Sequence, residues 1–334
     1  MKAGAKLLTF NELDKLFCLF VSRINVFCVI LPSAKLLMKT ELSILIPIYN
    51  ACCTPLVEQL YHQAKSLRGL RFEIIVADDG SDREDTIAAN KPINMLECCS
   101  YVLRDVNSGR AAIRNFLAGE ARYEWLLFID GDMSVVRNEF LADYLRCEDA
   151  DVVCGGYKVG KGEKSNLRYR YEKDAEPRLM AQERRKRPYY DFHTSNFMIR
   201  RDLMLDHPFD EQFRRYGYED VFFGKELRRA DIRIAHIDNP VGFDTFEDNP
   251  HFVEKTEEGL QTLYEFRYKL RGYNGLLTFV GGIHIGLVRS TIRLWHRLFG
   301  SLERRWLCGR HPNLTIFKLY KLGYYLTLTL TKDN

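Results

Sequence analysis

The chain has 334 residues, of which 46% are hydrophobic and 28% are charged, and its formal net charge is +4. These values exclude an intrinsically disordered chain and indicate a folded protein with a large core. The small net charge gives no support for a nucleic-acid partner, and we expect none. The nine cysteines show no metal-binding spacing. We therefore expect reduced thiols in a cytoplasmic protein, without structural zinc.

Residues 1–40 form an N-terminal extension whose apolar run is interrupted by Arg23 and Asn25. The run is short for a bilayer span, and no convincing signal-peptide cleavage site follows it. Three interpretations remain open. The segment is a helix on a membrane surface, a helix packed on the next domain, or translated upstream sequence that precedes a true start at Met38.

From Glu41 onward, predicted strands and helices alternate. Ser43–Asn50 and Phe72–Ala77 read as strands, and the residues between them show the apolar spacing of a helix. This order predicts a βαβ unit whose open end carries the function. Further strands are predicted at residues 95–104, 126–129, 151–157, 194–201 and 232–237. The pattern indicates an α/β domain over residues 41–270.

The most apolar of these strands ends in two acids. Leu126–Ile129 runs directly into Asp130-Gly131-Asp132, which places both carboxylates at the tip of a buried strand. Ligands of open α/β sheets bind beyond the carboxyl ends of strands. Two such carboxylates suit Mg²⁺ or Mn²⁺ held jointly with substrate phosphates. Taken alone, the pair is more typical of a solvated Asp-Gly turn.

Two other polar stretches have competing interpretations. Glu219-Asp220 falls at the start of a predicted helix, where, as an isolated pair, it is more typical of a cap than of a catalyst. Residues 158–190 are rich in charge and form either a solvated face or a mobile loop that closes over an anionic substrate. Gly155–Lys161 matches a phosphate-binding loop, but Gly162 stands where Ser or Thr is needed and no convincing apolar-faced helix follows.

Together these segments resemble a family 2 glycosyltransferase over about residues 41–270. The resemblance rests on five blocks in the family's order: SILIPIYN (43–50), VADDGS (76–81), NSGRAAIRN (107–115), LLFIDGDM (126–133) and YGYEDVFFGKEL (216–227). Each block alone is weak, and all five in order are specific. The resemblance implies a GT-A fold, an α/β domain with a Rossmann-like central sheet and helices on both faces, followed here by a helical C-terminal extension.

The resemblance also implies roles for individual residues. Those that would bind the nucleotide sugar are Pro47, Tyr49, Asn50, Asp78, Asp79, Arg110, Arg114 and Asp130. Asp130 and Asp132 match the family's DxD motif and would hold the metal, Mg²⁺ or Mn²⁺. Asp220 matches the family's catalytic base, and Glu219 its acceptor-positioning neighbour.

One departure concerns the metal. The family often has a histidine ligand in a stretch resembling NPVYH, whereas Asn239–Phe243 reads NPVGF. Asp244 is the candidate to replace that ligand, and His251 is a remoter one. Because Mg²⁺ is often bound by few side chains, the departure puts the third protein ligand in doubt rather than the metal.

The resemblance implies an inverting glycosyltransferase that moves a sugar from a nucleotide sugar, most simply a uridine-linked one, to a hydroxyl of a glycan or lipid-linked acceptor in cell-surface polysaccharide synthesis. A nucleotidyltransferase is an alternative, but it predicts a phosphate loop after the first strand, where Tyr49–Cys53 offers none. A degenerate, non-catalytic membrane partner is another alternative, motivated by Phe243.

Residues 271–334 form a basic C-terminal region. Leu276–Phe299 mixes apolar and aromatic residues with arginines, and so it cannot span a bilayer. It is either an amphipathic helix on an anionic membrane surface or a helix packed on the catalytic domain. We therefore expect a cytoplasmic protein, either free or peripheral on the inner face of the cell membrane.

Overall fold

The computed structural model describes residues 39–148 and 150–331, which belong to one compact unit, Met38–Asn334. The predictions for residues 1–38 lie outside the described residues. A seven-stranded sheet has the order β3-β2-β1-β4-β8-β6-β9. Its strands are β3 (Cys99–Leu103), β2 (Arg71–Asp78), β1 (Glu41–Ile48), β4 (Trp125–Ile129), β8 (Asn196–Arg200), β6 (Val152–Cys154) and β9 (Ile234–His236). A smaller sheet joins β5 (Met133–Val135), β10 (Val241–Phe243) and β7 (Tyr157–Val159).

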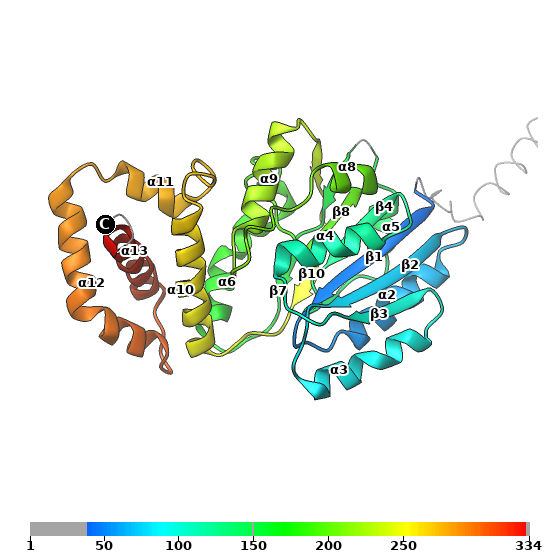
Figure 1. The fold of residues 1–334 in the computed structure, drawn as a ribbon, viewed down its shortest axis with the longest axis horizontal. Coiled ribbons are helices and arrows are strands. Elements are labelled where there is room, and N and C mark those ends of the chain that lie inside the picture. Colours follow the sequence, from blue (N-terminus) through cyan, green and yellow to red (C-terminus); the bar gives the residue numbers. More distant parts are fainter. Residues whose placement is uncertain (1–38, 149, 332–334) are drawn as a thin grey trace, which may run out of the picture. The chain divides into compact units, whose positions relative to one another are not determined.

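The helices lie around these sheets and in the C-terminal region (Figure 1). They are α2 (Thr54–Ser66), α3 (Glu84–Asn90), the 3-10 turn η1 (Lys91–Met95), α4 (Arg110–Glu120), α5 (Phe140–Leu145), α6 (Leu167–Leu179), α7 (Ala181–Arg184), α8 (Arg201–Asp206), α9 (Glu219–Arg229), α10 (Asn249–Glu265), α11 (Gly275–Gly282), α12 (Gly286–Leu307) and α13 (Leu314–Thr331).

The main sheet is mostly parallel, and it carries helices on both faces. β1 pairs in parallel with both β2 and β4, which confirms the predicted βαβ unit and the buried strand before Asp130. Successive residues of a strand point to opposite faces. Leu45 packs with Leu117 of α4 on one face, whereas α2 packs against β2 from the other. The carboxyl ends of β1, β2 and β4 therefore meet at one edge.

The predicted strand over residues 151–157 is confirmed only at Val152–Cys154, because the chain changes sheets after it. β6 ends at Cys154, and β7 begins at Tyr157 in the smaller sheet. Gly156 has a φ of +77°, which favours glycine. A Cβ on Gly155 would lie 2.3 Å from the Asn239 carbonyl oxygen. Gly155 and Gly156 thus permit the chain to turn sharply from the main sheet into the smaller one. An apolar pattern alone does not predict this turn.

The charged stretch 158–190 is largely helical rather than a loop. Helix α6 begins after Asn166, whose side chain caps it by accepting from the Tyr169 N–H. It buries only Leu167 and Glu172, and most of its other residues are polar or charged, so the sequence shows little apolar periodicity. Arg184 is buried and donates to the carbonyl oxygens of Gly155 and Ile237 at 2.8 and 3.0 Å. The Arg184 side chain therefore stabilises the turn at Gly155-Gly156 and does not belong to a solvated charged surface.

His236 lies beside Arg184 in a neutral form. Arg184 can only donate, so the contact of 2.6 Å between its Nη1 and His236 Nδ1 makes Nδ1 the acceptor. Nε2 then donates to the Pro188 carbonyl oxygen at 2.9 Å. Burial lowers the pKa of His236 to about 4, and the charge of Arg184 acts in the same direction.

Acid is therefore expected to destabilise the fold through His236. Because its folded pKa lies below its unfolded value, the unfolded chain binds more protons between about pH 6.5 and pH 4. We expect the free energy of unfolding to fall by up to about 3 kcal/mol across that window. Urea unfolding of the wild type and of His236→Gln checks this. Equal pH slopes for the two proteins would contradict it.

The C-terminal helices extend the same compact unit. Helix α10 is amphipathic and buries Phe252 and Leu263 among others. Helix α13 packs between α10 and α12 (Figure 1), and Phe317 of α13 joins Phe252 in one apolar cluster. Within the described part of the chain, no helix is both long and apolar enough to cross a bilayer.

Candidate active site

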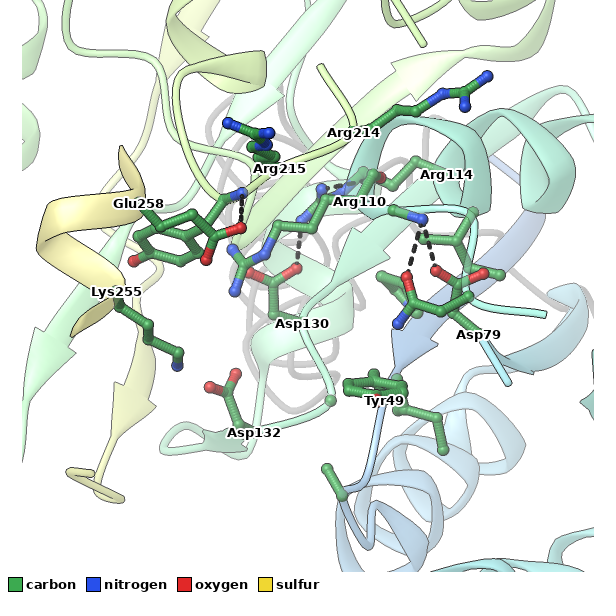
Figure 2. A pocket seen from close by; sticks show the side chains of 18 residues that line it. Tyr49, Asp79, Arg110, Arg114, Asp130, Asp132, Arg214, Arg215, Lys255 and Glu258 are labelled. Carbon is green, nitrogen blue, oxygen red and sulfur yellow. Dashed lines mark hydrogen bonds and ion pairs between the residues drawn. The ribbon is translucent and has the colours of Figure 1, made fainter. Parts of the chain in front are cut away.

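Two cavities meet at the carboxyl edge of the main sheet. The first encloses about 380 Å³ between the end of β1, the start of α4 and helix α10. The second encloses about 440 Å³ between the start of α9 and helices α6, α10 and α13. Their shared wall consists of Arg110, Asp130, Asp132, Tyr216 and Lys255. Figure 2 shows this wall from the side of the first cavity.

The turn that carries Asp130 and Asp132 depends on the glycine between them. A Cβ on Gly131 would lie 2.3 Å from Ile48 Cγ2 and 3.3 Å from the Pro47 carbonyl oxygen. Only glycine allows this close approach, and both carboxylates are left facing the cleft (Figure 2). Partial desolvation by the cleft walls, followed by repulsion from Asp130, raises the pKa of Asp132. A cation in the cleft would relieve that repulsion.

Arg114 lies in the wall behind the acids. It is 2% exposed. Its Nη2 donates to Asp130 Oδ1 at 2.6 Å, and its Nη1 lies 3.4 Å from Glu219 Oε1. Arg114 thus joins the end of β4 to the start of α9. Arg114 is predicted to bind the nucleotide sugar. It lines the first cavity, but its guanidinium contacts two carboxylates of the protein.

The other residues predicted to bind a nucleotide divide into two groups. Pro47, Tyr49, Asp79 and Arg110 line the first cavity. The carboxylate of Asp79 accepts from the N–H groups of Ser108 and Gly109 at 3.0 and 2.8 Å, so it also fixes the loop before α4.

Asp78 and Asn50 lie outside the lining of both cavities. Asp78 is fully buried and accepts from the Tyr101 hydroxyl at 2.7 Å. Asn50 accepts from the backbone N–H groups of Asp82 and Arg83 at 3.2 Å. Both side chains hold the loop after β2 in place, and the structure gives them no direct contact with the cleft.

Glu219 and Asp220 begin α9 and line the second cavity. Burial and the Asp220 carboxylate raise the pKa of Glu219, against the opposing charges of Arg110 and Arg114. Burial alone would raise the pKa of Asp220, but the nearby His193, the Val221 N–H and the charge of Arg114 together outweigh it and hold the pKa below its usual range. His193 Nδ1 lies 3.8 Å from Asp220 Oδ2. Asp220 therefore ionises more readily than Glu219.

The predicted third metal ligand does not join this wall. Asp244 lies outside both cavities and accepts from the Ser134 hydroxyl at 2.5 Å. Phe243 lines the second cavity and pairs with Met133, directly after Asp132. His251 is exposed and contacts Asp248 instead. Within residues 39–148 and 150–331, no group of three or more His, Cys, Asp or Glu side chains could hold a metal.

Several residues that line the two cavities belong to no sequence pattern that predicts a functional role. Lys255 of α10 faces both cavities and pairs with Glu247 at 3.2 Å. On an amphipathic helix, its spacing is that of a solvated lysine. Arg214 and Arg215 line the first cavity directly before Tyr216, so their position next to the YGYED block is the signal that could have found them. His193 precedes a predicted strand, and no pattern links it to Asp220.

The mostly parallel sheet, with the paired acids and the two adjoining cavities at its carboxyl edge, has the arrangement of the GT-A fold. Residues 43–207 match the model of glycosyl transferase family 2. No curated protein sequence matches the chain.

One solved structure with a TM-score above 0.5 supports the fold. The mannosyltransferase PcManGT from Pyrobaculum calidifontis, in complex with GDP-Man and Mn²⁺, has a TM-score of 0.54 and 13% identity and covers 87% of this chain and 86% of its own. S. aureus TarS 1–349 in complex with UDP-GlcNAc has a TM-score of 0.48 and 19% identity over 88% and 91% of the two chains. A longer TarS structure has a TM-score of 0.49 and 20% identity over 87% of this chain. The present chain spans 55% of that protein's length.

Proposed function

We propose that the protein is an inverting glycosyltransferase that moves a sugar from a uridine-linked nucleotide sugar to a hydroxyl of a glycan or lipid-linked acceptor, in cell-surface polysaccharide synthesis. One observation carries the proposal. The two cavities meet at Asp130 and Asp132, and Asp220 lines the second cavity but not the first. This separation provides one side for a donor and another for an acceptor, with a base on the acceptor side.

The first cavity suits a nucleoside diphosphate. Arg110, Arg214, Arg215 and Lys255 line it and bring positive charge to a site where phosphate oxygens are to be held. Asp132, together with Asp130, would hold Mg²⁺ or Mn²⁺. Two carboxylates are enough for these ions when phosphates and water complete the shell. When bound, the cation would neutralise charge on the departing diphosphate.

The second cavity suits the attacking hydroxyl. Asp220 would accept the proton of the acceptor hydroxyl as its oxygen bonds to the anomeric carbon. The bond from that carbon to the phosphate oxygen breaks, and its electron pair leaves with the nucleoside diphosphate. Arg114 contacts Glu219, and we do not assign Glu219 the role of a second nucleophile. A single displacement therefore inverts the anomeric carbon, and retained stereochemistry in the product would overturn the proposal.

Calorimetric titration with uridine diphosphate, with and without Mn²⁺, tests the donor side. We expect Mn²⁺-dependent binding that Asp132→Ala weakens on the order of 10- to 100-fold or more, the range seen when groups around a metal are removed. Asp244→Ala is the matched control, since this acid lies outside both cavities. Equal losses in the two variants, or no binding in the presence of metal, would contradict the proposed roles of Asp130 and Asp132.

A lipid-linked acceptor requires access to the membrane. We therefore propose peripheral attachment at the inner face of the cell membrane, through the C-terminal helices. In this arrangement the acceptor's apolar part stays in the bilayer while its hydroxyl enters the second cavity.

A further inference from the structure

Helix α12 carries its apolar side chains outward. Leu287, Leu294, Leu298 and Leu302 recur at spacings of seven, four and four, which places them on one face of a helix, and they are 76%, 57%, 61% and 59% exposed. Buried packing normally selects the apolar face of an amphipathic helix. Here the residues turned toward the protein include buried Glu303 and half-buried His296.

The exposed face also contains aromatic residues and continues beyond α12. Trp295 and Trp306 are about half exposed, and Phe299 lies beside Trp295 with ring centroids 4.4 Å apart. Helix α11 has no buried residue, and its Phe279 is 59% exposed. We call the α11–α12 face the set of exposed apolar residues Phe279, Ile285, Leu287, Val288, Leu294, Trp295, Leu298, Phe299, Leu302 and Trp306.

The charge around the α11–α12 face is mostly positive. Residues 275–310 contain arginines at positions 289, 293, 297, 304, 305 and 310 and one acid, Glu303. Glu303 is buried and accepts from Trp295 Nε1 at 2.8 Å, so it does not offset the arginines at the surface. Arg304 pairs with Glu257 of α10 at 2.8 Å and Arg293 donates to the Leu326 carbonyl oxygen of α13 at 3.1 Å. The exposed positive charge beside the face therefore comes chiefly from Arg297, Arg305 and Arg310. An apolar stripe bordered by arginine and tryptophan has the composition of a helix that lies in the interface of an anionic bilayer.

We propose that the α11–α12 face binds the surface of an anionic lipid bilayer, with α12 lying in the plane of the interface. The charge favours lipid over a second copy of the chain, because two copies of this face would bring their arginines together. An anionic headgroup layer complements those arginines, and the acyl region accepts the leucines and aromatic rings. The helix need not span the bilayer.

Bilayer binding at this face would serve the acceptor cavity, and this part of the inference rests on the proposed function. Helix α13 packs between α12 and α10 (Figure 1). Phe317 and Lys321 of α13, with Phe252 and Lys255 of α10, line the second cavity. Helix α13 thus contacts α12 and also lines the cavity that contains the proposed base. Lipid binding by the α11–α12 face does not itself depend on catalysis.

Cosedimentation with vesicles tests the proposal. We expect the full chain to bind vesicles of pure phosphatidylglycerol and to bind pure phosphatidylcholine vesicles much more weakly, with the difference shrinking as salt is raised. Leu298→Glu and Leu287→Glu are each expected to weaken binding on the order of tenfold or more, as expected when a buried leucine is lost from an apolar environment. Met95→Glu is the matched control, because Met95 is 87% exposed on the catalytic domain.

The outcomes are separable. All three substitutions are at exposed positions, so we expect unchanged thermal unfolding, and circular dichroism verifies it for each variant. Phosphatidylglycerol binding that Met95→Glu weakens as much as Leu298→Glu would overturn the assignment. A dimer in light scattering that Leu298→Glu dissociates, with no vesicle binding, would overturn it in favour of a second copy. The uridine diphosphate titration needs no lipid, so failure of the proposed function would appear there alone.

Discussion

Replacing Asp220 by asparagine is expected to reduce sugar transfer about 10²- to 10⁴-fold, the contribution of a positioned general base. Asparagine keeps the shape of the side chain but cannot accept the acceptor's proton at neutral pH. The measurement is the rate of nucleoside diphosphate release from the donor. Because Asp220 lines only the second cavity, we expect the affinity for uridine diphosphate to remain within about twofold, so that the loss falls on turnover.

Asp202→Asn is the matched control for charge and side-chain size. Asp202 lies on α8, is 55% exposed and pairs with Arg200 away from both cavities. Its substitution should leave turnover unchanged. If Asp220→Asn retained full turnover, or lost donor affinity as much as turnover, Asp220 would not be the base.

The contact with His193 supplies a second readout for the same role. His193 holds the pKa of Asp220 low against burial, which raises it. In His193→Gln that support is lost, so the pKa of Asp220 rises and the carboxylate is protonated at higher pH. We therefore expect the acid limb of the pH–rate profile to move toward higher pH in the variant. A purely structural role for His193 would lower the rate without moving that limb.

The fold was largely predictable because its signals are local. The apolar strands before Asp78 and Asp130 end in polar turns, and the order of strands and helices indicates a parallel sheet. The turn at Gly155-Gly156 was not predictable in this way. Its cause is the close approach of Asn239, which is distant in the sequence.

The candidate site was predictable only where a residue belongs to one of the five sequence blocks that resemble the family. Asp130, Asp132 and Asp220 sit at the ends of elements that converge on one edge, and the structure brings them to one pair of cavities. Lys255 reaches the same cavities from a helix whose pattern is that of any amphipathic surface helix. Asp244 is separated from Asp132 because β10 turns its side chain toward Ser134, a consequence of pairing that the sequence does not display.

Arg114→Met is expected to have the largest effect on stability. Methionine fills a similar volume but leaves Glu219 and Asp130 without their buried partner. Removing one member of a buried ion-pair network typically costs about 3–5 kcal/mol, because the remaining charges are left uncompensated. Urea unfolding measures this as a lower midpoint at an unchanged slope. Arg200→Met is the control. Arg200 is 38% exposed, and exposed pairs contribute about 1 kcal/mol or less.

The pH dependence of that loss distinguishes uncompensated charge from lost packing. The pKa of Glu219 is already raised by burial and Asp220, and Arg114 opposes the rise. Without Arg114 the folded-state pKa of Glu219 rises further, so Glu219 takes up a proton at higher pH in the variant. The wild type loses the stability that its ion pair supplies as pH falls through the carboxylate pKa values. The difference between the two proteins should therefore shrink toward acid pH. A difference that stays constant from neutral to acid pH would mean that Arg114 acts by filling space, and the link between the two cavities would be one of packing rather than charge.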